Sequence, residues 1–447
     1  MMGLKGPSVS FVLSGASEEA LHQAAVDAAN QTMGTWEEPE LPSQDGLVPT
    51  GRGREILGLI YRACKGADWP VFQLGTFEPE GDCDVNGRYH LPTRREPKLL
   101  PFRLFRFLAE SMLDTKVDHG NGPEFTRQLR AWRPQFRRHS LSGLNQRQIL
   151  LRLHQRGQKV TEVGGNIFQV GQGKNARFIR GSVTGSCGAL LTTLQADKVA
   201  TARLLRLHGL PTVEHRRVYN EAQALIAADE LRYPVVIKPF NGARGRNVVC
   251  DIRSPEELRT QLAALNTARD SMMVERQVEG DAFRFLLVNQ QFGYCSKKSH
   301  AFVTGDGERT IAALIKAYCE IGYVEENRKK NAFGFDEFAK KNSIDELLKR
   351  DDLSFSDVLP QGQTLKITKI PSVLFGSELE YLVQDSIPVE IWKHCLAIAR
   401  LFQGEAIGID GIGLFDEPEK FVFNEVNFGP ELIESKNYGI TVDLLGY

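Results

Sequence analysis

The pattern of apolar and polar positions changes near residue 140. Beyond it, short apolar runs of strand length alternate with amphipathic stretches of helix length. The clearest helix spans 195–209, where five apolar residues fall on one side at 3.6 residues per turn: Ala196, Val199, Ala200, Leu204 and Leu207. Gly209 is expected to end this helix, and Lys198 points away from its apolar side. This part of the chain predicts a mixed α/β (α+β) fold.

Strands are predicted where β-branched or aromatic runs lie between turn residues. In chain order they fall in 233–251 (two strands around a glycine-containing loop), 271–278, 281–289, 406–415 and 420–427. A further helix is expected after Ser254, which is a suitable N-cap residue with Glu257 three positions later.

The first 138 residues follow a less regular pattern. Residues 9–15 suggest a strand and turn, and 17–33 suggest a helix with an acidic first turn. Arginines cluster over 94–138, with aromatic residues between them: Phe102, Phe105, Phe107 and Trp132. This cluster is either a helical surface whose aromatic residues face the core, or a docking face for an acidic substrate, peptide or carrier protein.

The final two predicted strands carry the most informative polar residues. The intervening Asp-Glu-Pro-Glu is a good turn sequence, so a hairpin centred between Glu417 and Pro418 is expected. That register places Asp410 directly opposite Glu425, with Asn427 on the same face as Glu425. Two facing carboxylates repel each other, and the repulsion grows as water is excluded.

Two arrangements would relieve this repulsion. One carboxylate keeps a proton, or a cation lies between the two. Two acids and an amide oxygen form an all-oxygen ligand set suited to Mg²⁺, which would take its other ligands from water and phosphates. The alternative is a solvent-facing hairpin edge with ordinary acids. Phe421 and Phe423 are expected to share the face of Glu425, which argues against an exposed edge.

A phosphate-binding segment is predicted upstream. Lys238 ends an apolar strand, and Gly242 and Gly245 in the following loop would allow the backbone to approach an anion. The lysine precedes the glycines and no Gly-Lys-Ser/Thr sequence follows, so this is not a Walker A loop. A plain hairpin with a basic tip is the alternative.

Composition limits the class of protein without naming it. The chain has 447 residues, enough for two or three domains, with 42% hydrophobic and 25% charged residues. A formal net charge of -1 favours neither nucleic acid nor membrane as a partner. Neither a signal peptide nor a membrane span is recognisable, and seven scattered cysteines favour neither a disulfide framework nor a zinc site. A cytoplasmic location is expected.

The ordered set of short segments resembles the ATP-grasp superfamily. Its members share a helix lysine, a strand lysine before a glycine loop, a Val-Glu hinge, and an acid followed by a closing Asn-Glu-Val-Asn. The resemblance is greatest to the ATP-grasp part of cyanophycin synthetase and of the glutathione-synthesising fusion ligases. Three more segments are similar to theirs: "FQVGQGKNARFIRG" at 168–181, "FRFLLVN" at 283–289 and "VTGDGERTIAALI" at 303–315.

The resemblance implies an ATP-grasp fold, with ATP held between two α/β subdomains, and an additional amino-terminal domain. The expected divisions are an amino-terminal domain of unclear type at 1–138, a segment preceding the ATP-grasp domain at 139–190, and the ATP-grasp domain at 191–447. Within the last, 191–275 would be the first subdomain, and 276–447 the second, with the Mg²⁺ site.

The implied activity is that of an ADP-forming carboxylate–amine ligase. ATP would convert a substrate carboxylate to an acyl phosphate, and an amine would attack it to form an amide or peptide bond. Amino acids or short peptides in a biosynthetic pathway are the expected substrates. Mg²⁺ is the expected metal, as two ions, with Mn²⁺ as an alternative. A homo-oligomer is expected only as a general property of relatives.

The resemblance also implies roles for individual residues. Arg284 and Lys298 would lie near the transferred phosphate. The metal ligands would be Asp410, Glu425 and Asn427. The nucleotide would contact Lys198, Lys238, Gly242, Gly245, Glu275, Arg276, Gln277, Val278 and Asp281. Such a site fits phosphoryl transfer, which needs positioning and positive charge rather than a protein nucleophile.

Two departures from the family pattern matter. Ala282 stands where relatives have a ribose-binding acid, which leaves Asp281 or Glu279 as substitutes. The segment 368–378 replaces the family's acceptor-side loop, so the substrates are expected to differ from those of cyanophycin synthetase. Two alternatives to a ligase stay open: an ATP-grasp kinase, and an ATP-binding regulatory protein without catalysis.

Overall fold

The structure is a computed structural model. It describes the residues in the following ranges, and the remaining residues are not discussed: 8–13, 57–58, 60, 63–64, 76–79, 87–92, 101, 103–104, 123–138, 141, 144–240, 247–265, 271–321, 328–329 and 333–430. The chain divides into two compact units, with the boundary between Gly185 and Ser186. Each unit is described by itself.

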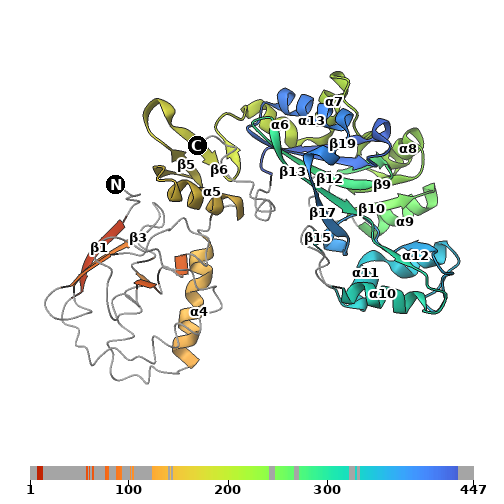
Figure 1. The fold of residues 1–447 in the computed structure, drawn as a ribbon, viewed down its shortest axis with the longest axis horizontal. Coiled ribbons are helices and arrows are strands. Elements are labelled where there is room, and N and C mark those ends of the chain that lie inside the picture. The colour runs from red at the N-terminus through yellow and green to blue at the C-terminus, as the bar shows by residue number, and fades with distance from the viewer. Residues whose placement is uncertain are drawn as a thin grey trace. The chain divides into compact units, whose positions relative to one another are not determined.

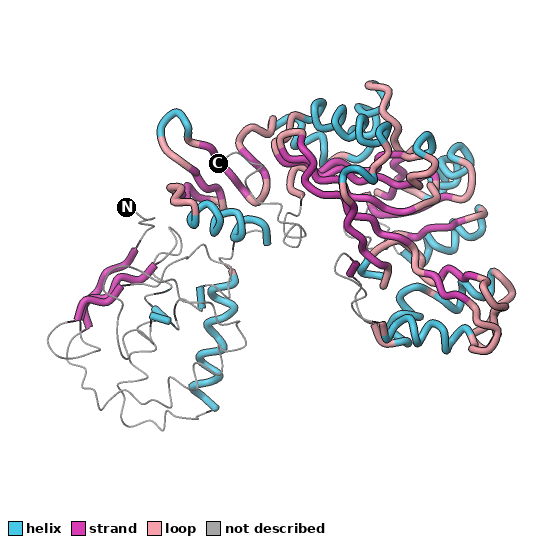
Figure 2. Tube along the Cα trace, in the orientation of Figure 1, coloured by secondary structure: helices cyan, strands magenta, loops and turns pink. Residues whose placement is uncertain are grey.

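The first unit contains two small antiparallel sheets (Figures 1 and 2). One has the order β1-β3-β2, where β1 is Ser8–Leu13, β2 is Thr76–Pro79 and β3 is Gly87–Pro92. The other runs β4-β5-β6-β7, from Val160–Gly164, Ile167–Val170, Arg177–Arg180 and Val183–Thr184. The unit also contains the helices α4 (Pro123–Arg137) and α5 (Leu144–Gln155), the 3₁₀ turn Gly173–Asn175, and a few described helical residues within 57–64 and 101–104. The predicted strand at 9–15 is therefore confirmed, whereas the predicted helix at 17–33 lies outside the described residues.

Helix α4 belongs to the arginine cluster. Phe136 is buried and Trp132 half-buried, while Arg127, Arg130 and Arg137 are exposed. Exposed arginines and buried aromatic residues are compatible with both interpretations of the cluster, a plain helical surface and a docking face. Most of 94–122 lies outside the described residues.

The second unit begins with a four-stranded antiparallel sheet of order β10-β9-β11-β8. Its strands are β8 (His215–Val218), β9 (Val235–Pro239), β10 (Val249–Ile252) and β11 (Met272–Arg276). Helices α8 (Glu221–Leu231) and α9 (Pro255–Leu265) pack against it through one apolar cluster that includes Ala228, Val235 and Leu258 (Figure 1). The predicted strands and the helix after Ser254 are confirmed.

A six-stranded sheet of order β15-β17-β13-β12-β18-β19 forms the rest of the unit's framework. Its strands are β12 (Asp281–Val288), β13 (Gln291–Ser299), β15 (Arg328–Lys329), β17 (Glu378–Leu382), β18 (Ala406–Gly413) and β19 (Val422–Asn427). Helix α13 (Val389–Phe402) packs on one face, where the His394 ring meets Phe423 and the Phe402 ring meets Phe428. That face is apolar, so the polar residues of the sheet gather on the opposite face.

A helical insert separates β13 from β17. It has a core of its own, which includes Ile315, Phe338 and Leu348, and it occupies the lower right of Figure 1. Its elements are β14 (Phe302–Thr304), α10 (Ile311–Glu320), α11 (Phe335–Asn342), α12 (Ile344–Arg350) and β16 (Thr364–Lys366). The 3₁₀ turns of this unit are Val373–Phe375, Gln384–Ser386 and Pro418–Lys420.

The helix predicted at 195–209 is broken at Asp197. Two helices form instead, α6 (Ala189–Ala196) and α7 (Lys198–Leu207). The Asp197 carboxylate accepts hydrogen bonds from the N–H groups of Val199 and Ala200, both at 3.0 Å, which makes Asp197 the N-cap of α7. Lys198 therefore lies at the first position of a helix rather than inside one.

The overall class agrees with the predicted α+β fold, since helices pack on antiparallel sheets in both units. A hinge at 277–280 joins β11 of the smaller sheet to β12 of the larger. Among the residues that the structure describes, no helix has the length and apolar character needed to cross a membrane.

Candidate active site

The hairpin of β18 and β19 brings the predicted carboxylates together. Asp410 pairs with Glu425 across the two strands, and Gly408 pairs with Asn427, as the turn sequence predicted. Directly paired residues have Cβ atoms about 5 Å apart, so the two carboxylates lie within reach of one common partner.

A β-bulge changes which face these acids occupy. Asp410 pairs with Glu425, but Gly411 pairs with Phe423, so Asn424 is an extra residue in β19. The alternation of faces shifts by one at this point. The prediction that Phe421 and Phe423 share the face of Glu425 is therefore wrong: the phenylalanines are buried in the core, and Glu425 lies on the opposite, open face with a side chain that is 31% exposed.

Two cationic side chains neutralise the facing carboxylates. Arg284 binds both oxygens of Asp410, with Nη2 2.8 Å from Oδ2 and a second hydrogen bond from Nε to Oδ1. Lys198 Nζ lies 3.5 Å from Glu425 Oε2. The sequence left open a protonated carboxylate or a cation between the two acids, and the protein itself supplies two cations. Phosphate oxygens could compete for both cations, and a metal ion could replace them at the carboxylates.

The fold fixes each member of this cluster from a different element. Arg284 lies on β12, where it pairs with Asp410 on β18, and both are about three-quarters buried. Burial lowers the pKa of Arg284, but the charge and hydrogen bonds of Asp410 outweigh it and raise the pKa above its usual value. At Gly408, a Cβ would lie 3.0 Å from Pro430 Cβ and 3.4 Å from Arg284 Nη1, so the tight neighbour there is Pro430.

The outer edge of β19 is held by the chain that follows α7. Val213 N donates to Phe423 O at 3.2 Å, and Phe423 N donates to Pro211 O at 3.1 Å. The Gln195 side chain accepts a hydrogen bond from Phe428 N at 2.8 Å. These bonds anchor α6 and α7 beside β19, which explains why Lys198 reaches Glu425.

A second ionic cluster lies in the smaller sheet. Lys238 Nζ is 2.6 Å from Glu275 Oε1, and the two side chains are only 12% and 7% exposed. The ring of His215 also faces this carboxylate, with Nδ1 at 4.0 Å. Sequence reasoning identified Lys238 and Glu275 but missed His215. A strand pairing of β8 with β11 would have revealed it, because His215 is the partner of Glu275.

Burial dominates the titration of His215. Its side chain is 1% exposed, and desolvation lowers its pKa below the usual 6.5, although the nearby Glu275 carboxylate opposes this shift. His215 is therefore neutral at pH 7, and Lys238 carries the positive charge of this cluster.

The last residue of β11 and the first residue of the hinge are held to the smaller sheet by backbone hydrogen bonds. Arg276 N donates to Glu214 O at 2.9 Å, and Gln277 N donates to Pro234 O at 3.2 Å. The Gln277 side chain accepts a hydrogen bond from Asp251 N at 2.6 Å. The N–H groups of Arg276 and Gln277 are therefore already used within the protein. A hinge N–H that donates to adenine would be that of Val278.

The remaining predicted residues are placed less centrally. Lys298 pairs with Ala282 on β12 and shares the open face of Arg284. Asp281 lies on the other face, where its carboxylate is 3.0 Å from Lys297 Nζ. The structure thus does not bring Asp281 together with Asp410 and Glu425. Gly242 and Gly245 lie outside the described residues.

The donor chemistry at Asp410 and Glu425 fits a magnesium ion. Within the described ranges, no group of three or more His, Cys, Asp and Glu side chains could hold a metal. Only two carboxylates and the amide of Asn427 are available, so most ligands of an ion would come from water and phosphates. Mg²⁺ binds in this manner, whereas structural metal sites supply nearly all ligands from protein.

Comparison with known proteins identifies relatives with ligase names, although no family model matches the chain. It is 30% identical over 255 residues to a cyanophycin synthetase of Trichormus variabilis, a match that covers 56% of this chain and 27% of that protein. It is also 30% identical over 109 residues to a D-alanine–D-alanine ligase of Pseudomonas fluorescens, covering 24% and 33% of the two chains.

Among solved structures, a bifunctional glutathione synthetase from Pasteurella multocida aligns with a TM-score of 0.43 and 15% identity, over 78% of this chain and 53% of that one. The chain spans about a quarter of the length of the cyanophycin synthetases it matches. The sequence relatives confirm the predicted resemblance to ATP-grasp ligases.

Proposed function

Taking the resemblance to ATP-grasp ligases as the premise, we propose that this protein is an ATP-dependent carboxylate–amine ligase. It forms an amide or peptide bond between small substrates, such as an amino acid and a second amino acid or short peptide, through an acyl phosphate. One observation carries the proposal: Arg284, Asp410, Glu425 and Lys198 gather on the open face of the larger sheet, as two ion pairs that phosphates and a metal can exchange.

The charges of this cluster match the needs of phosphoryl transfer. The transition state spreads negative charge over the transferred phosphoryl oxygens, and fixed cations stabilise it without forming a covalent bond. Arg284 is held by its hydrogen bonds to Asp410, and Lys198 is held at the start of α7. Lys298, on the same face as Arg284, is a third cation for the transferred phosphate or the substrate carboxylate.

The metal ligands in this proposal are Asp410, Glu425 and Asn427. Mg²⁺ bound there would neutralise the ATP phosphates and orient them for transfer. Two metal ions fit this site, because Asp410 and Glu425 each already contact a separate cation, Arg284 and Lys198. Mn²⁺ could take the place of Mg²⁺. Asp410 and Glu425 would hold the metal, and Lys198 and Arg284 would then be available to contact phosphate oxygens.

The nucleotide base is assigned to the hinge. Lys238 is fixed by Glu275 at the border of the glycine-containing loop, where it can contact phosphate or the adenine edge. Val278 offers the next backbone N–H along the hinge after those of Arg276 and Gln277. Asp281 and Glu279 remain the two candidates for the ribose, and the ion pair of Asp281 with Lys297 favours Glu279, which is exposed.

The reaction has two steps with balanced products. The substrate carboxylate attacks the γ-phosphorus of ATP, and ADP leaves. The amine then attacks the acyl carbon, and inorganic phosphate leaves as the C–N bond forms. Arg284 and Lys198 hold phosphate charge in both steps, so neither needs to act as a nucleophile.

The test is to follow ADP release with pools of amino acids, Mg²⁺ and ATP. A ligase releases ADP only when an amine is present with the carboxylate, and hydroxylamine traps the acyl phosphate as a hydroxamate. A kinase instead accumulates a phosphorylated product without any amine. A regulatory ATP-binding protein binds nucleotide without turnover, and that outcome would refute the proposal.

A second, independent proposal concerns the arginine cluster at 94–138. Arg127, Arg130 and Arg137 lie exposed along α4, which supports docking of an acidic peptide or carrier protein. Binding of a fluorescent polyglutamate peptide tests it. Affinity should fall steeply between about 50 and 300 mM salt, because exposed charges are screened. Salt-independent or absent binding argues for a structural surface only.

A further inference from the structure

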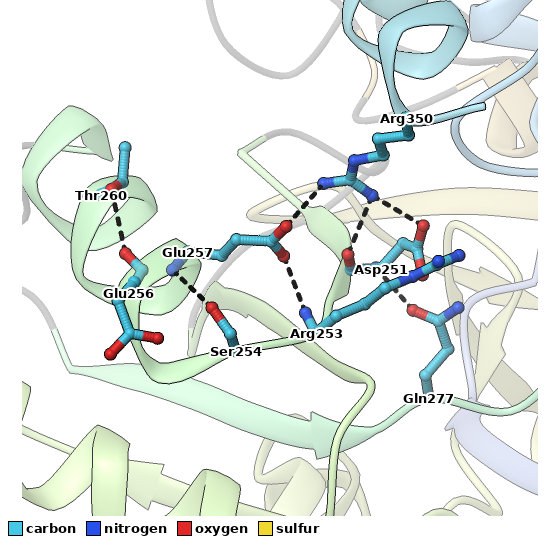
Figure 3. A network of polar contacts seen from close by, with 8 residues as sticks. All are labelled: Asp251, Arg253, Ser254, Glu256, Glu257, Thr260, Gln277 and Arg350. Atoms are coloured by element: carbon cyan, nitrogen blue, oxygen red, sulfur yellow. Dashed lines mark hydrogen bonds and ion pairs between the residues drawn. The ribbon is translucent and has the colours of Figure 1, made fainter. Parts of the chain in front are cut away.

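A polar network joins three parts of the larger unit at the hinge. It contains Asp251 of β10, Gln277 of the hinge and Arg350, the last residue of α12 in the helical insert (Figure 3). Asp251 and Arg350 are separated by 99 residues in the chain. The network therefore ties together segments whose relative position the local sequence does not fix.

The network begins at a bulge in β10. The pairing of β10 with β9 shifts between Val249 and Ile252, and Asp251 has φ +59, a left-handed conformation that Asp and Asn tolerate better than most residues. The peptide groups of Asp251 find partners outside the strand. Its N–H donates to Gln277 Oε1 at 2.6 Å, and its carbonyl accepts from Arg350 Nη1 at 3.1 Å.

Arg350 makes further contacts with acids of the smaller sheet's subdomain. Its Nη1 also donates to Asp251 Oδ2 at 2.7 Å, and its Nη2 lies 3.7 Å from Glu257 Oε1. Figure 3 shows the guanidinium reaching down between these two carboxylates. Glu257 is itself anchored, because its Oε2 accepts from Arg253 N at 2.8 Å. Arg350 is thus the cationic link between the insert and the subdomain of β8–β11.

The placement of these groups gives the link a mechanical consequence. Arg350 belongs to an insert with its own core, which is joined in sequence to β13 and β17 of the larger sheet. Asp251 and Glu257 belong to the smaller sheet's subdomain, on the other side of the hinge. Rotation of one subdomain away from the other would break the Arg350 bonds, which require one relative placement.

We propose that Arg350 and Asp251 form a clasp that closes the two subdomains and, through the bond of Asp251 to Gln277, positions the hinge for nucleotide binding. Both are positioning residues, because neither is assigned a contact with ATP. The inference rests on the proposed function, since it concerns the same nucleotide site. The clasp strengthens nucleotide binding by reducing the cost of ordering the hinge when ATP arrives.

The chain offers a matched control. Arg253 Nε donates to Asp251 Oδ1 at 2.9 Å, so it contacts the same carboxylate as Arg350. Arg253 lies two residues from Asp251 and joins no second subdomain to it. Arg253→Gln and Arg350→Gln therefore remove the same charge from the same acid, and only Arg350→Gln opens the clasp.

The experiment measures the affinity of the full chain for a non-hydrolysable ATP analogue with Mg²⁺, by calorimetry. Arg350→Gln should weaken binding about fivefold, in line with the loss of an exposed charge-assisted hydrogen bond, and Arg253→Gln should stay within about twofold of wild type. In turnover assays, KM for ATP should rise with kcat unchanged or increased. Hydrogen exchange of the amides in 272–280 should accelerate in Arg350→Gln alone.

Asp251→Asn completes a double-mutant cycle and keeps the left-handed backbone conformation. Together with Arg350→Gln it should weaken binding by less than the product of the two single effects, because the two substitutions share the contact between Arg350 and the Asp251 carboxylate. The clasp would be overturned if Arg350→Gln and Arg253→Gln bound the nucleotide with equal affinity. This holds whether both variants keep the melting temperature of the wild type or both lose the same amount of stability. A wild-type chain that binds no nucleotide refutes the proposed function, and the clasp with it.

Discussion

Two lysine–glutamate pairs lie in the two sheets of the larger unit, and their surroundings differ. Lys238 and Glu275 are 2.6 Å apart and about nine-tenths buried in the smaller sheet. Lys198 and Glu425 are 3.5 Å apart on the open face of the larger sheet, where Glu425 is 31% exposed. The first pair is enclosed by strands β8, β9 and β11, whereas the second joins a helix start to a strand.

The difference separates a structural role from an exchangeable one. Separating the buried pair would leave an unpaired charge in a poorly hydrated site, so Lys238 and Glu275 stay together. The open pair gains less from its longer contact, because Glu425 is partly exposed to solvent, although the Lys198 side chain is only 16% exposed. Exchange for a new partner is therefore easier there than in the buried pair. Phosphate for Lys198 and a metal for Glu425 are such partners. The same substitution in each pair, Glu→Gln, therefore distinguishes the two roles.

Glu425→Gln has the largest expected effect. It keeps the size of the side chain but removes a negative charge from the proposed metal site. We expect turnover to fall about a thousandfold, since a metal ion supplies several kcal/mol of transition-state stabilisation. The free energy of unfolding should change by less than about 0.5 kcal/mol. Steady-state ADP release and urea denaturation measure the two quantities.

Wild-type turnover of Glu425→Gln at limiting Mg²⁺ would contradict the metal assignment. A parallel titration of Mg²⁺ against nucleotide affinity identifies the cause of any loss, because a metal ligand variant needs more Mg²⁺ to bind ATP. Loss of turnover with an unchanged Mg²⁺ requirement would assign Glu425 to the organic substrate instead.

Glu275→Gln should act mainly on stability. It leaves the Lys238 ammonium buried without a carboxylate, and removal of one member of a buried pair costs about 3 kcal/mol. Urea denaturation monitored by circular dichroism measures this loss. Glu275→Gln and Lys238→Met together should recover part of it, because the double variant leaves no unpaired charge. A single variant as stable as wild type would show that the pair is not sealed from water.

The sequence predicted the position of the acids better than the face on which they lie. The pairing of Asp410 with Glu425 was predicted correctly, but the predicted register fails nearer the turn, where Gly411 pairs with Phe423 and Ile412 with Val422. The bulge restores the predicted pairing at Asp410. The bulge at Asn424 left no local mark, because an inserted polar residue fits either alternation. Asp197 is a common N-cap type, so the break between α6 and α7 could have been anticipated from sequence.

Contacts between distant segments lay beyond sequence reasoning. The ion pairs of Lys198 with Glu425 and of Arg350 with Asp251 depend on how whole subdomains pack. His215 was missed for a related reason. Its burial is decided by strand pairing, and the neighbouring arginines make β8 look exposed.

Gly411→Ala tests the bulge that separates the core from the acids. A Cβ at Gly411 would lie 2.4 Å from a carbon of the buried Phe421 ring, so the ring or the strand must move. Overpacking of this kind costs about 2 kcal/mol of unfolding free energy. Activity should fall as well, because Asp410 is the adjacent residue. Gly185→Ala is the control, since a Cβ there would meet Phe178 only at 3.5 Å, an ordinary contact, and it should change stability by less than about 0.5 kcal/mol.

His215 gives the smallest expected effect, a dependence of stability on pH that arises from the buried cluster. Its folded pKa lies below the usual 6.5 because of burial, so the unfolded chain binds a proton more readily. Stability is therefore complete above about pH 6.5 and declines as the pH falls toward the lower folded pKa. One pKa unit corresponds to about 1.4 kcal/mol, so the loss of stability grows with the extent to which burial lowers the pKa of His215.

His215→Gln should flatten this dependence, and His208→Gln should not, because His208 is exposed at the end of α7. Some slope should persist in His215→Gln, since burial also lowers the pKa of His300 in the segment between β13 and β14. Urea denaturation at several pH values resolves the two contributions. An unchanged slope in His215→Gln would mean that water reaches the cluster, and the contrast between the enclosed and the open lysine–glutamate pair would then disappear.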